Sequence, residues 1–314
     1  MNTKIKLLLA GFAAALFWIG GCDSDSPFAP GGIDISKLEG KIVFVAPADD
    51  NTESGYTYQY EAYVMDADGG NVKRITYTPI VYQYSKDRKD DICWSPDGTQ
   101  IIYSGGDRIQ LMEADGKGNH QIIYNFDGAL NPCWNPDGSK LMYRTSGGDL
   151  YIREFSGGLI KFTFEDNLSV SVHNPAWSPD GQKIAFASAF EGDFDIYVVN
   201  IDGTGLTNLT NSPGGDGQPR WSPDGTKIAF YHGEGVGQTN IYVMDADGGN
   251  QIKITDCPRG DMAFHPSWSR DGSKIAFRSG AGIYVVNADG THATKIYMHK
   301  TEAPSGQVSS FDWH

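Results

Sequence analysis

Basic residues are scarce in this chain. It contains 25 lysines and arginines against 39 aspartates and glutamates, which gives a formal net charge of −14. A protein that binds a phosphate backbone needs a basic surface, so the composition argues against a nucleic-acid partner. The same acidic balance does not suit electrostatic adhesion to anionic lipids, so any membrane attachment must have another source.

Cysteine is also rare, and recognisable catalytic motifs are missing. The four cysteines form no Cys-x-x-Cys pair and no Cys/His spacing typical of a zinc site. The chain contains no Gly-x-Ser-x-Gly elbow and no appended hydrolase domain. We therefore predict no catalytic residues, no resident metal and no cofactor, and we lean towards a protein that is not an enzyme.

The only long hydrophobic run lies near the N-terminus. It extends from Leu7 to about Gly20, which is short for a bilayer span, and Lys4 and Lys6 precede it. This pattern indicates a secretory signal peptide. The following Ile-Gly-Gly-Cys, which ends at Cys22, resembles the lipobox of bacterial lipoproteins. An ordinary signal with an incidental cysteine is the alternative.

These features predict three segments. Residues 1–21 form the signal peptide, residues 22–39 form an acidic tether rich in Ser, Pro and Gly, and residues 40–314 form the folded domain. Cys22 would carry the lipid. We expect a monomer that is lipid-anchored in the bacterial cell envelope, either periplasmic or surface-exposed.

Tryptophan recurs through the folded domain at intervals of 40 to 47 residues. The six tryptophans are Trp94, Trp134, Trp177, Trp221, Trp268 and Trp313. The first five open the phrase Trp-(Ser/Asn)-x-Asp-Gly, and Trp313 lacks it. A fixed period in this range is typical of repeat folds, and a unit of four short strands indicates a β-propeller blade.

The repeat around Trp221 illustrates the unit. Ser222-Pro223-Asp224-Gly225 suits a type I turn, and it leads into the alternating strand Lys227–Phe230. A third strand, Ile241–Met244, is followed by an Asp-Gly hairpin turn and by a fourth strand over Gln251–Thr255. Each repeat is therefore predicted to be a four-stranded antiparallel meander.

The order of the strands predicts how the ring closes. The domain enters at a second strand, Ile42–Phe44, and ends on a lone first strand at Phe311–Trp313. We predict an all-β, six-bladed propeller in which this C-terminal strand completes the N-terminal blade. Such closure removes exposed sheet edges.

Two cysteines occupy the same position in neighbouring repeats, directly before the tryptophan. They are Cys93 and Cys133. A disulfide between them would require Cα atoms within about 7 Å. We expect packed free thiols instead.

The repeated phrases carry a family resemblance. Trp-Ser-Pro-Asp-Gly-x-x-Ile-Ala-Phe followed by Ile-Tyr-Val-x-(Asp/Asn)-x-Asp-Gly resembles the WD40-like PD40 repeats of TolB-like propellers, over roughly residues 40–314. The resemblance implies one of several roles, because the family includes binding proteins, gating propellers of peptidases and a few metal-dependent lyases. The α/β domain that precedes the propeller in TolB has no expected counterpart here.

Strand alternation predicts two different faces of the propeller. The turn face carries the short turns, such as 222–225 and 245–248. The variable face carries the longer connections, such as 47–61 and 77–91. Variable loops on a rigid framework often carry function, so we place the candidate site on the variable face.

A ring of polar residues is predicted where the central channel opens on the variable face. These residues stand three positions before each tryptophan and are Asp91, Asn131, Asn174, Gln218, His265 and Ser310. With His173 beside them, they could form a polar funnel that binds a peptide end, a sugar or a metal. Alternatively, they cap backbone groups at the strand starts.

Aromatic residues form a second candidate surface on the same face. The connections 47–61 and 77–91, which flank the outer strands of the first blade, contain Tyr56, Tyr58, Tyr60, Tyr82, Tyr84 and Arg88. Tyrosine and arginine are enriched at protein interfaces. The alternative is that residues 56–60 simply extend the third strand.

We therefore carry two functional hypotheses. The first is a membrane-anchored, non-catalytic propeller that binds another envelope protein or a peptide segment of one. The second is a metal-dependent lyase or hydrolase that acts on an envelope or extracellular glycan through the channel, with ligands drawn from His173, His265, Gln218 and Asp91.

Overall fold

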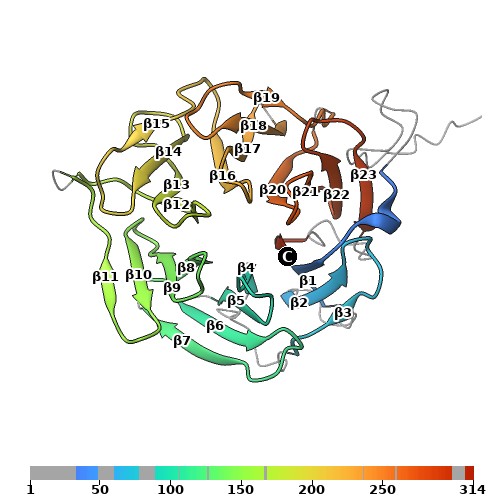
Figure 1. Ribbon diagram of the computed structural model, residues 1–314, viewed down its shortest axis with the longest axis horizontal. Coiled ribbons are helices and arrows are strands. Elements are labelled where there is room, and N and C mark those ends of the chain that lie inside the picture. The colour runs from blue at the N-terminus through green and yellow to red at the C-terminus, as the bar shows by residue number, and fades with distance from the viewer. Residues whose placement is uncertain are drawn as a thin grey trace, which may run out of the picture.

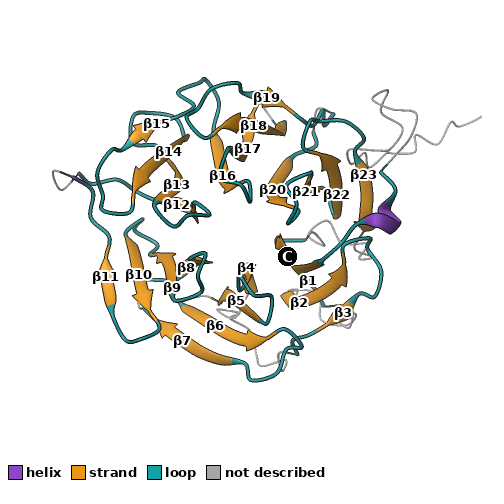
Figure 2. Ribbon diagram, viewed as in Figure 1, coloured by secondary structure: helices purple, strands orange, loops and turns teal. Residues whose placement is uncertain are grey.

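Six four-stranded antiparallel sheets surround a common axis in the part of the chain that the structure describes (Figure 1). The structure is a computed structural model. It describes residues 33–48, 60–77, 89–105, 107–125, 127–165, 168–235, 237–258, 260–298 and 308–314. Figure 2 shows mostly strands and loops among the described residues, with a short 3-10 turn, η1 (Ile35–Lys37), before the first strand. The predicted all-β, six-bladed propeller is confirmed.

Each blade contributes one strand to each of four concentric positions. The innermost strands are β4 (Lys89–Trp94), β8 (Leu130–Trp134), β12 (His173–Trp177), β16 (Asp216–Trp221), β20 (Ala263–Trp268) and β24 (Ser310–Trp313). The second strands are β1 (Lys41–Pro47), β5 (Gln100–Gly105), β9 (Lys140–Arg144), β13 (Lys183–Ser188), β17 (Lys227–Gly233) and β21 (Lys274–Ser279).

The two outer positions complete the blades. The third strands are β2 (Tyr60–Asp66), β6 (Arg108–Glu113), β10 (Leu150–Glu154), β14 (Asp195–Asn200), β18 (Thr239–Asp245) and β22 (Gly282–Asn287). The outermost strands are β3 (Lys73–Arg74), β7 (His120–Tyr124), β11 (Leu159–Lys161), β15 (Thr207–Asn208), β19 (Ile252–Lys253) and β23 (Thr294–Met298). β19 is shorter than the predicted Gln251–Thr255, because an outermost strand has a pairing partner on one side only.

The C-terminal strand closes the ring as predicted. β24 pairs with β1, with Phe311 opposite Phe44 and Trp313 opposite Ile42. The sheet order β24-β1-β2-β3 therefore joins the two ends of the domain in one blade. The indole of Trp313 also donates to the Glu39 carbonyl oxygen, at 3.0 Å.

The repeated Asp-Gly turns are held by the same hydrogen bonds in blade after blade. In the turn after β16, the Ser222 hydroxyl donates to Asp224 at 2.6 Å, and Asp224 accepts the Thr226 amide at 3.0 Å. Gly225 takes a φ of 72°, which is costly for other residues. The phrase is therefore a structural turn, and its register places both sets of short turns on the turn face, since Lys227 pairs with Asp245.

The core lies between adjacent blades. The second strands contribute buried aromatic side chains at equivalent positions, namely Phe44, Phe186, Phe230 and Phe277, each at most 1% exposed. Full burial of one such ring stabilises the fold by roughly 1.5–3 kcal/mol. Trp268 packs with Phe277 and with Ile241 of the preceding blade, so the tryptophans of the repeat help to join neighbouring sheets.

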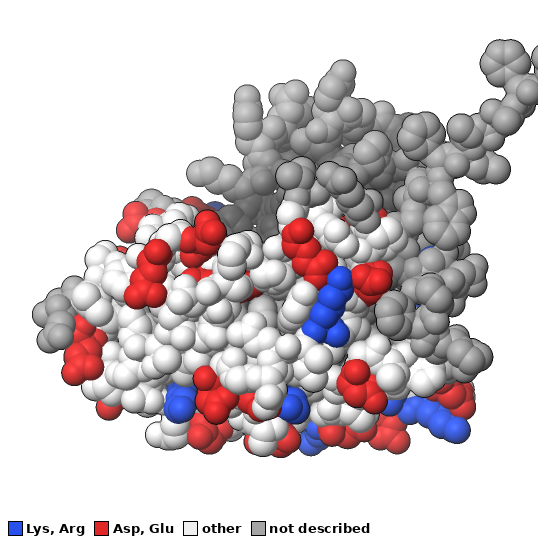
Figure 3. Space-filling model, turned by 90° about the horizontal axis from the view of Figure 1, so that it is seen from above, with Lys and Arg blue, Asp and Glu red and all other residues white. Residues whose placement is uncertain are grey.

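The surface agrees with the acidic composition. On the side drawn in Figure 3, acidic side chains are spread widely, and the basic ones lie mostly along the lower rim beside acidic neighbours. Among the described residues, no helix is long and apolar enough to cross a bilayer.

Candidate functional site

The predicted polar ring coincides with a backbone irregularity in five blades. Each innermost strand shifts register against the second strand at the ring residue. The ring residues there have positive φ, with values of 49° at Asp91 and Asn131, 48° at Asn174, and 54° at Gln218 and His265. This conformation is uncommon outside glycine, and β-bulges of this kind redirect a side chain.

Ring side chains bond across the boundaries between blades. Asp91 accepts the Asn131 amide and the Ser104 hydroxyl, both at 3.2 Å. Gln218 accepts the His265 amide at 2.7 Å, and the Ser310 hydroxyl accepts the Ile92 amide at 3.3 Å. Three of the six ring side chains therefore cap backbone groups of the next blade, which is the structural alternative considered above.

The two histidines of the candidate funnel lie in different surroundings. His173 meets the Phe194 ring edge-on at 5.0 Å, and burial together with the nearby Arg144 charge lowers its pKa. His265 lies beside Gln218, and burial together with the charges of Arg278 and Arg220 lowers its pKa well below the usual value. Both imidazoles are therefore neutral near pH 7.

The candidate metal ligands do not converge. Among the described residues, no group of three or more His, Cys, Asp or Glu side chains is placed to hold a metal ion. Arg144 donates to Asn131 at 2.6 Å, so a cation already occupies the ring next to Asp91. The arrangement fits the capping of strands better than it fits metal chemistry.

A second tier of residues near the axis was largely missed by sequence reasoning. It consists of the residues directly before each tryptophan, which are Cys93, Cys133, Ala176, Arg220, Ser267 and Asp312. Asp312 accepts the Ser267 hydroxyl at 3.0 Å and the Trp94 amide at 3.1 Å. Only the cysteines of this tier had drawn attention, although reading the same repeat position in every blade would have revealed Arg220 and Asp312.

The two cysteines of this tier carry free thiols, as expected. Burial, followed by the nearby Asp312 carboxylate, raises the pKa of Cys93 well above its usual value. Burial also raises the pKa of Cys133. Both sulfurs are therefore protonated thiols at neutral pH.

Exposed apolar side chains also lie in the connections of the variable face. Phe190 is 41% exposed and Phe194 is 39% exposed, and both lie in the β13–β14 loop. Leu168 and Met262, each 43% exposed, lie in the connections that lead into β12 and β20. Sequence analysis missed these residues, because isolated apolar residues in loops carry no periodic signal.

The aromatic surface predicted from sequence is described only in part. Tyr60 lies at the start of β2, opposite Pro47, and packs partly against the core, which agrees with an extended strand. Tyr56, Tyr58, Tyr82, Tyr84 and Arg88 lie outside the described residues, as does Cys22.

Comparison with known structures shows the same fold in proteins of different roles. TolB from Acinetobacter baumannii superimposes with a TM-score of 0.67 and 21% identity, covering 90% of this chain and 67% of that chain. A chain of a nidogen/laminin complex superimposes with a TM-score of 0.64 and 11% identity, covering 87% of this chain and 98% of that chain. An oligogalacturonate lyase from Vibrio parahaemolyticus superimposes with a TM-score of 0.52 and 16% identity, covering 83% of this chain and 74% of that chain.

At these identities, the structural matches show the fold alone. No sequence among the curated proteins matches the chain. The model of the TolB beta propeller domain family, PD40, matches residues 105–278, which is more than half of the 314 residues. Since this match agrees with the six closed blades and their repeated turn phrase, the chain belongs to the TolB β-propeller domain family.

Proposed function

We propose that this protein is a membrane-anchored, non-catalytic propeller lipoprotein that binds another envelope protein, or a peptide segment of one, through its variable face. The observation that carries the proposal is Phe194, which is 39% exposed and packs edge-on against His173 beside the ring. An exposed aromatic ring beside polar groups suits the anchor position of a protein interface. Aromatic side chains in particular dominate the energy of protein interfaces.

The polar ring complements this apolar group. Asn174 and His173 lie at the start of β12, and the Phe194 ring contacts His173. A partner segment that covers Phe194 would therefore meet polar groups at its edge. An apolar centre with a polar rim is the usual anatomy of a protein interface.

The path of the N-terminal segment supports the anchoring part of the proposal. The Ile33 amide donates to Thr294 at 3.0 Å, at the turn-face start of β23, and Lys41 begins β1 on the same face. A lipid on Cys22 would thus hold the domain from its turn face. The variable face would remain available to a partner in the envelope.

The enzymatic alternative has weaker support. It requires metal ligands that converge, and His173 and His265 instead contact Phe194 and Gln218 respectively. The likeness to an oligogalacturonate lyase is a likeness of fold alone. We therefore do not propose a glycan lyase.

Crosslinked affinity capture from the protein's own cell envelope, read by mass spectrometry, tests the binding function. We expect one dominant partner protein, lost with Phe194→Ser and retained with Leu159→Ser. Leu159 is a matched control because it is 55% exposed on the outermost strand of another blade. Equal capture by both variants would refute the assignment to this face.

A separate measurement tests the anchor. Cys22→Ser should move the protein from the detergent phase to the aqueous phase and remove the acyl mass from its N-terminal peptide. An unchanged partition would show that Cys22 is not lipidated, and this outcome would leave the binding face untouched.

A further inference from the structure

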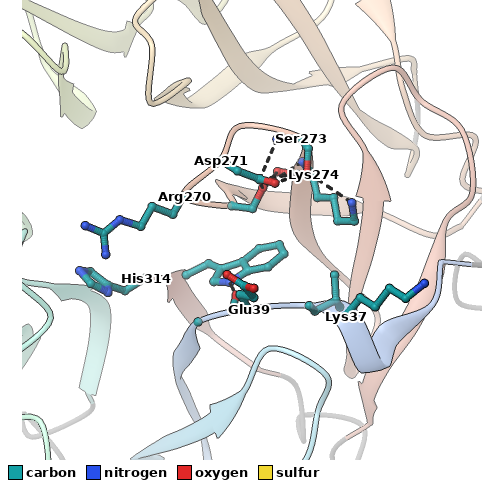
Figure 4. A pocket seen from close by; sticks show the side chains of 11 residues that line it. Lys37, Glu39, Arg270, Asp271, Ser273, Lys274 and His314 are labelled. Atoms are coloured by element: carbon teal, nitrogen blue, oxygen red, sulfur yellow. Dashed lines mark hydrogen bonds between the residues drawn. The ribbon is translucent and has the colours of Figure 1, made fainter.

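Two adjoining pockets open on the turn face, opposite the surface discussed above. One has a volume of about 480 Å³ and lies between the N-terminal segment and the blade formed by β20–β23, where Lys37, Glu39 and Lys274 line it (Figure 4). The other, of about 270 Å³, lies at the axis and is lined by Arg220, Trp268 and Asp312 among others. Both pockets share Arg270, Trp313 and His314, so they form one turn-face groove.

We propose that the turn-face groove binds an acidic peptide segment of a partner protein, and that Arg220 and Arg270 pair with its carboxylates. The proposal is independent of the function assigned to the variable face. It rests on the charge, the shape and the lining of the groove.

The two arginines lack acidic partners. Arg220 donates to the Pro219 carbonyl oxygen at 3.0 Å, and among the described residues neither Arg220 nor Arg270 forms an ion pair. Several cations elsewhere in this acidic chain are paired, as Lys227 is with Asp245 at 2.8 Å. An arginine without a carboxylate at a pocket is available to a bidentate anionic ligand.

Most of the acidic side chains that line the groove already accept hydrogen bonds from other residues of the chain. Asp312 accepts the two hydrogen bonds from Ser267 and Trp94 described above. Asp271 accepts the Ser269 hydroxyl at 2.6 Å and the Ser273 amide at 3.0 Å, which holds its pKa at about 2. Glu39 is the lining side-chain carboxylate without such bonds among the described residues, and Figure 4 shows it between Lys37 and His314.

The shape and the floor of the groove favour a peptide. Leu38, Trp268 and Trp313 provide apolar lining between the charged groups. The larger pocket, of about 480 Å³, lies within the range of about 300–1,000 Å³ that is typical of ligand sites. A concave groove offers little to a flat lipid surface, and an inorganic anion would leave the apolar floor unused.

Fluorescence anisotropy on the full chain in mild detergent tests the proposal, with a fluorescein-labelled Leu-Glu-Glu-Leu-Glu-Glu peptide as probe. We expect saturable binding that weakens about tenfold in Arg270→Gln and in Arg220→Gln, since charge-assisted bonds contribute about 1.5–3 kcal/mol. Glu39→Gln should tighten binding by removing a like charge. Added salt should weaken binding.

Arg108→Gln is the matched control. Arg108 is an exposed arginine on β6 that lies 3.6 Å from Asp107, and its loss should leave binding unchanged. Arg270 is exposed, so Arg270→Gln should fold normally even if Arg220→Gln does not.

Three results would overturn the proposal. The first is the absence of saturable binding, and the second is an equal loss in the Arg108 variant. The third is full displacement of the probe by phosphatidylglycerol vesicles or by inorganic phosphate, which would identify a membrane or a small anion as the occupant.

Discussion

The Thr255 hydroxyl donates to the side-chain oxygen of Asn240 at 3.0 Å inside the blade formed by β16–β19. Thr255 also accepts the Ile241 amide at 2.9 Å, and Asn240 is fully buried. The same latch joins Thr210 to Asp195 and Thr76 to Glu61 in two other blades. In each case, a polar pair connects the end of the outermost strand to the buried start of the third strand.

This latch predicts a stability effect. Thr255→Val should lower the free energy of unfolding by about 1–3 kcal/mol, because Asn240 would keep a buried polar oxygen with one partner fewer. Urea unfolding followed by tryptophan fluorescence measures the change. Thr207→Val on exposed β15 serves as the control and should stay within about 0.5 kcal/mol of the parent. Similar losses in both variants would contradict the role of the latch.

Closure by the C-terminal strand predicts a larger effect. Trp313→Ala should destabilise the propeller by about 3–5 kcal/mol, since Trp313 is 6% exposed and packs in the core of the closing blade. Deletion of the last five residues should destabilise the whole ring further. A truncated chain with the melting temperature of the full chain would show that closure does not depend on β24.

The repeated turns predict loss of stability in acid. Hydrogen bonds from serine and the backbone lower the pKa of Asp97 and of Asp271 to about 2. A carboxyl with a depressed pKa contributes stability that is present above the pKa of the unfolded chain and is lost as the pH falls through the folded value. The melting temperature should therefore fall as the pH drops from about 4 to about 2.

Asp271→Asn provides the control for the acid effect. This variant should have a lower melting temperature than the parent at neutral pH, and its melting temperature should fall less over the acidic range. If the two proteins show parallel profiles, Asp271 does not contribute to the acid sensitivity.

The two thiols near the axis, Cys93 and Cys133, should react slowly with thiol reagents. Because the thiolate is the reactive form, the raised pKa values of Cys93 and Cys133 should protect both from a disulfide reagent in the native state. Both should react once the chain is unfolded in guanidinium chloride, and Cys93→Ser would assign one of the two sites. Rapid labelling of the native protein would mean that the second tier is open to reagent.

Sequence reasoning was most successful where a pattern repeats. The recurring tryptophan located all six blades, and the repeated apolar phrases located the second and third strands, most of which are buried along nearly their whole length. The C-terminal closure followed from counting strands. These features depend on local chemistry that the repeat displays several times.

Other features depend on contacts that form only in the folded chain, between residues in different strands or loops. The pairing of Thr255 with Asn240 spans 15 residues and has no signal in either strand alone. The positive φ at Gln218 is unusual for this residue type, so the sequence did not indicate the bulge there. Phe190 and Phe194 became candidates only when the fold placed their loop beside His173.

The affinity of the captured partner for purified variants tests the central claim most directly. The account predicts that Phe194→Ser weakens binding at least tenfold, because an exposed aromatic anchor at an interface contributes about 2 kcal/mol or more. Leu159→Ser should bind like the parent, and all three proteins should melt alike. Equal affinity of the parent and Phe194→Ser would contradict the assignment of partner binding to the variable face.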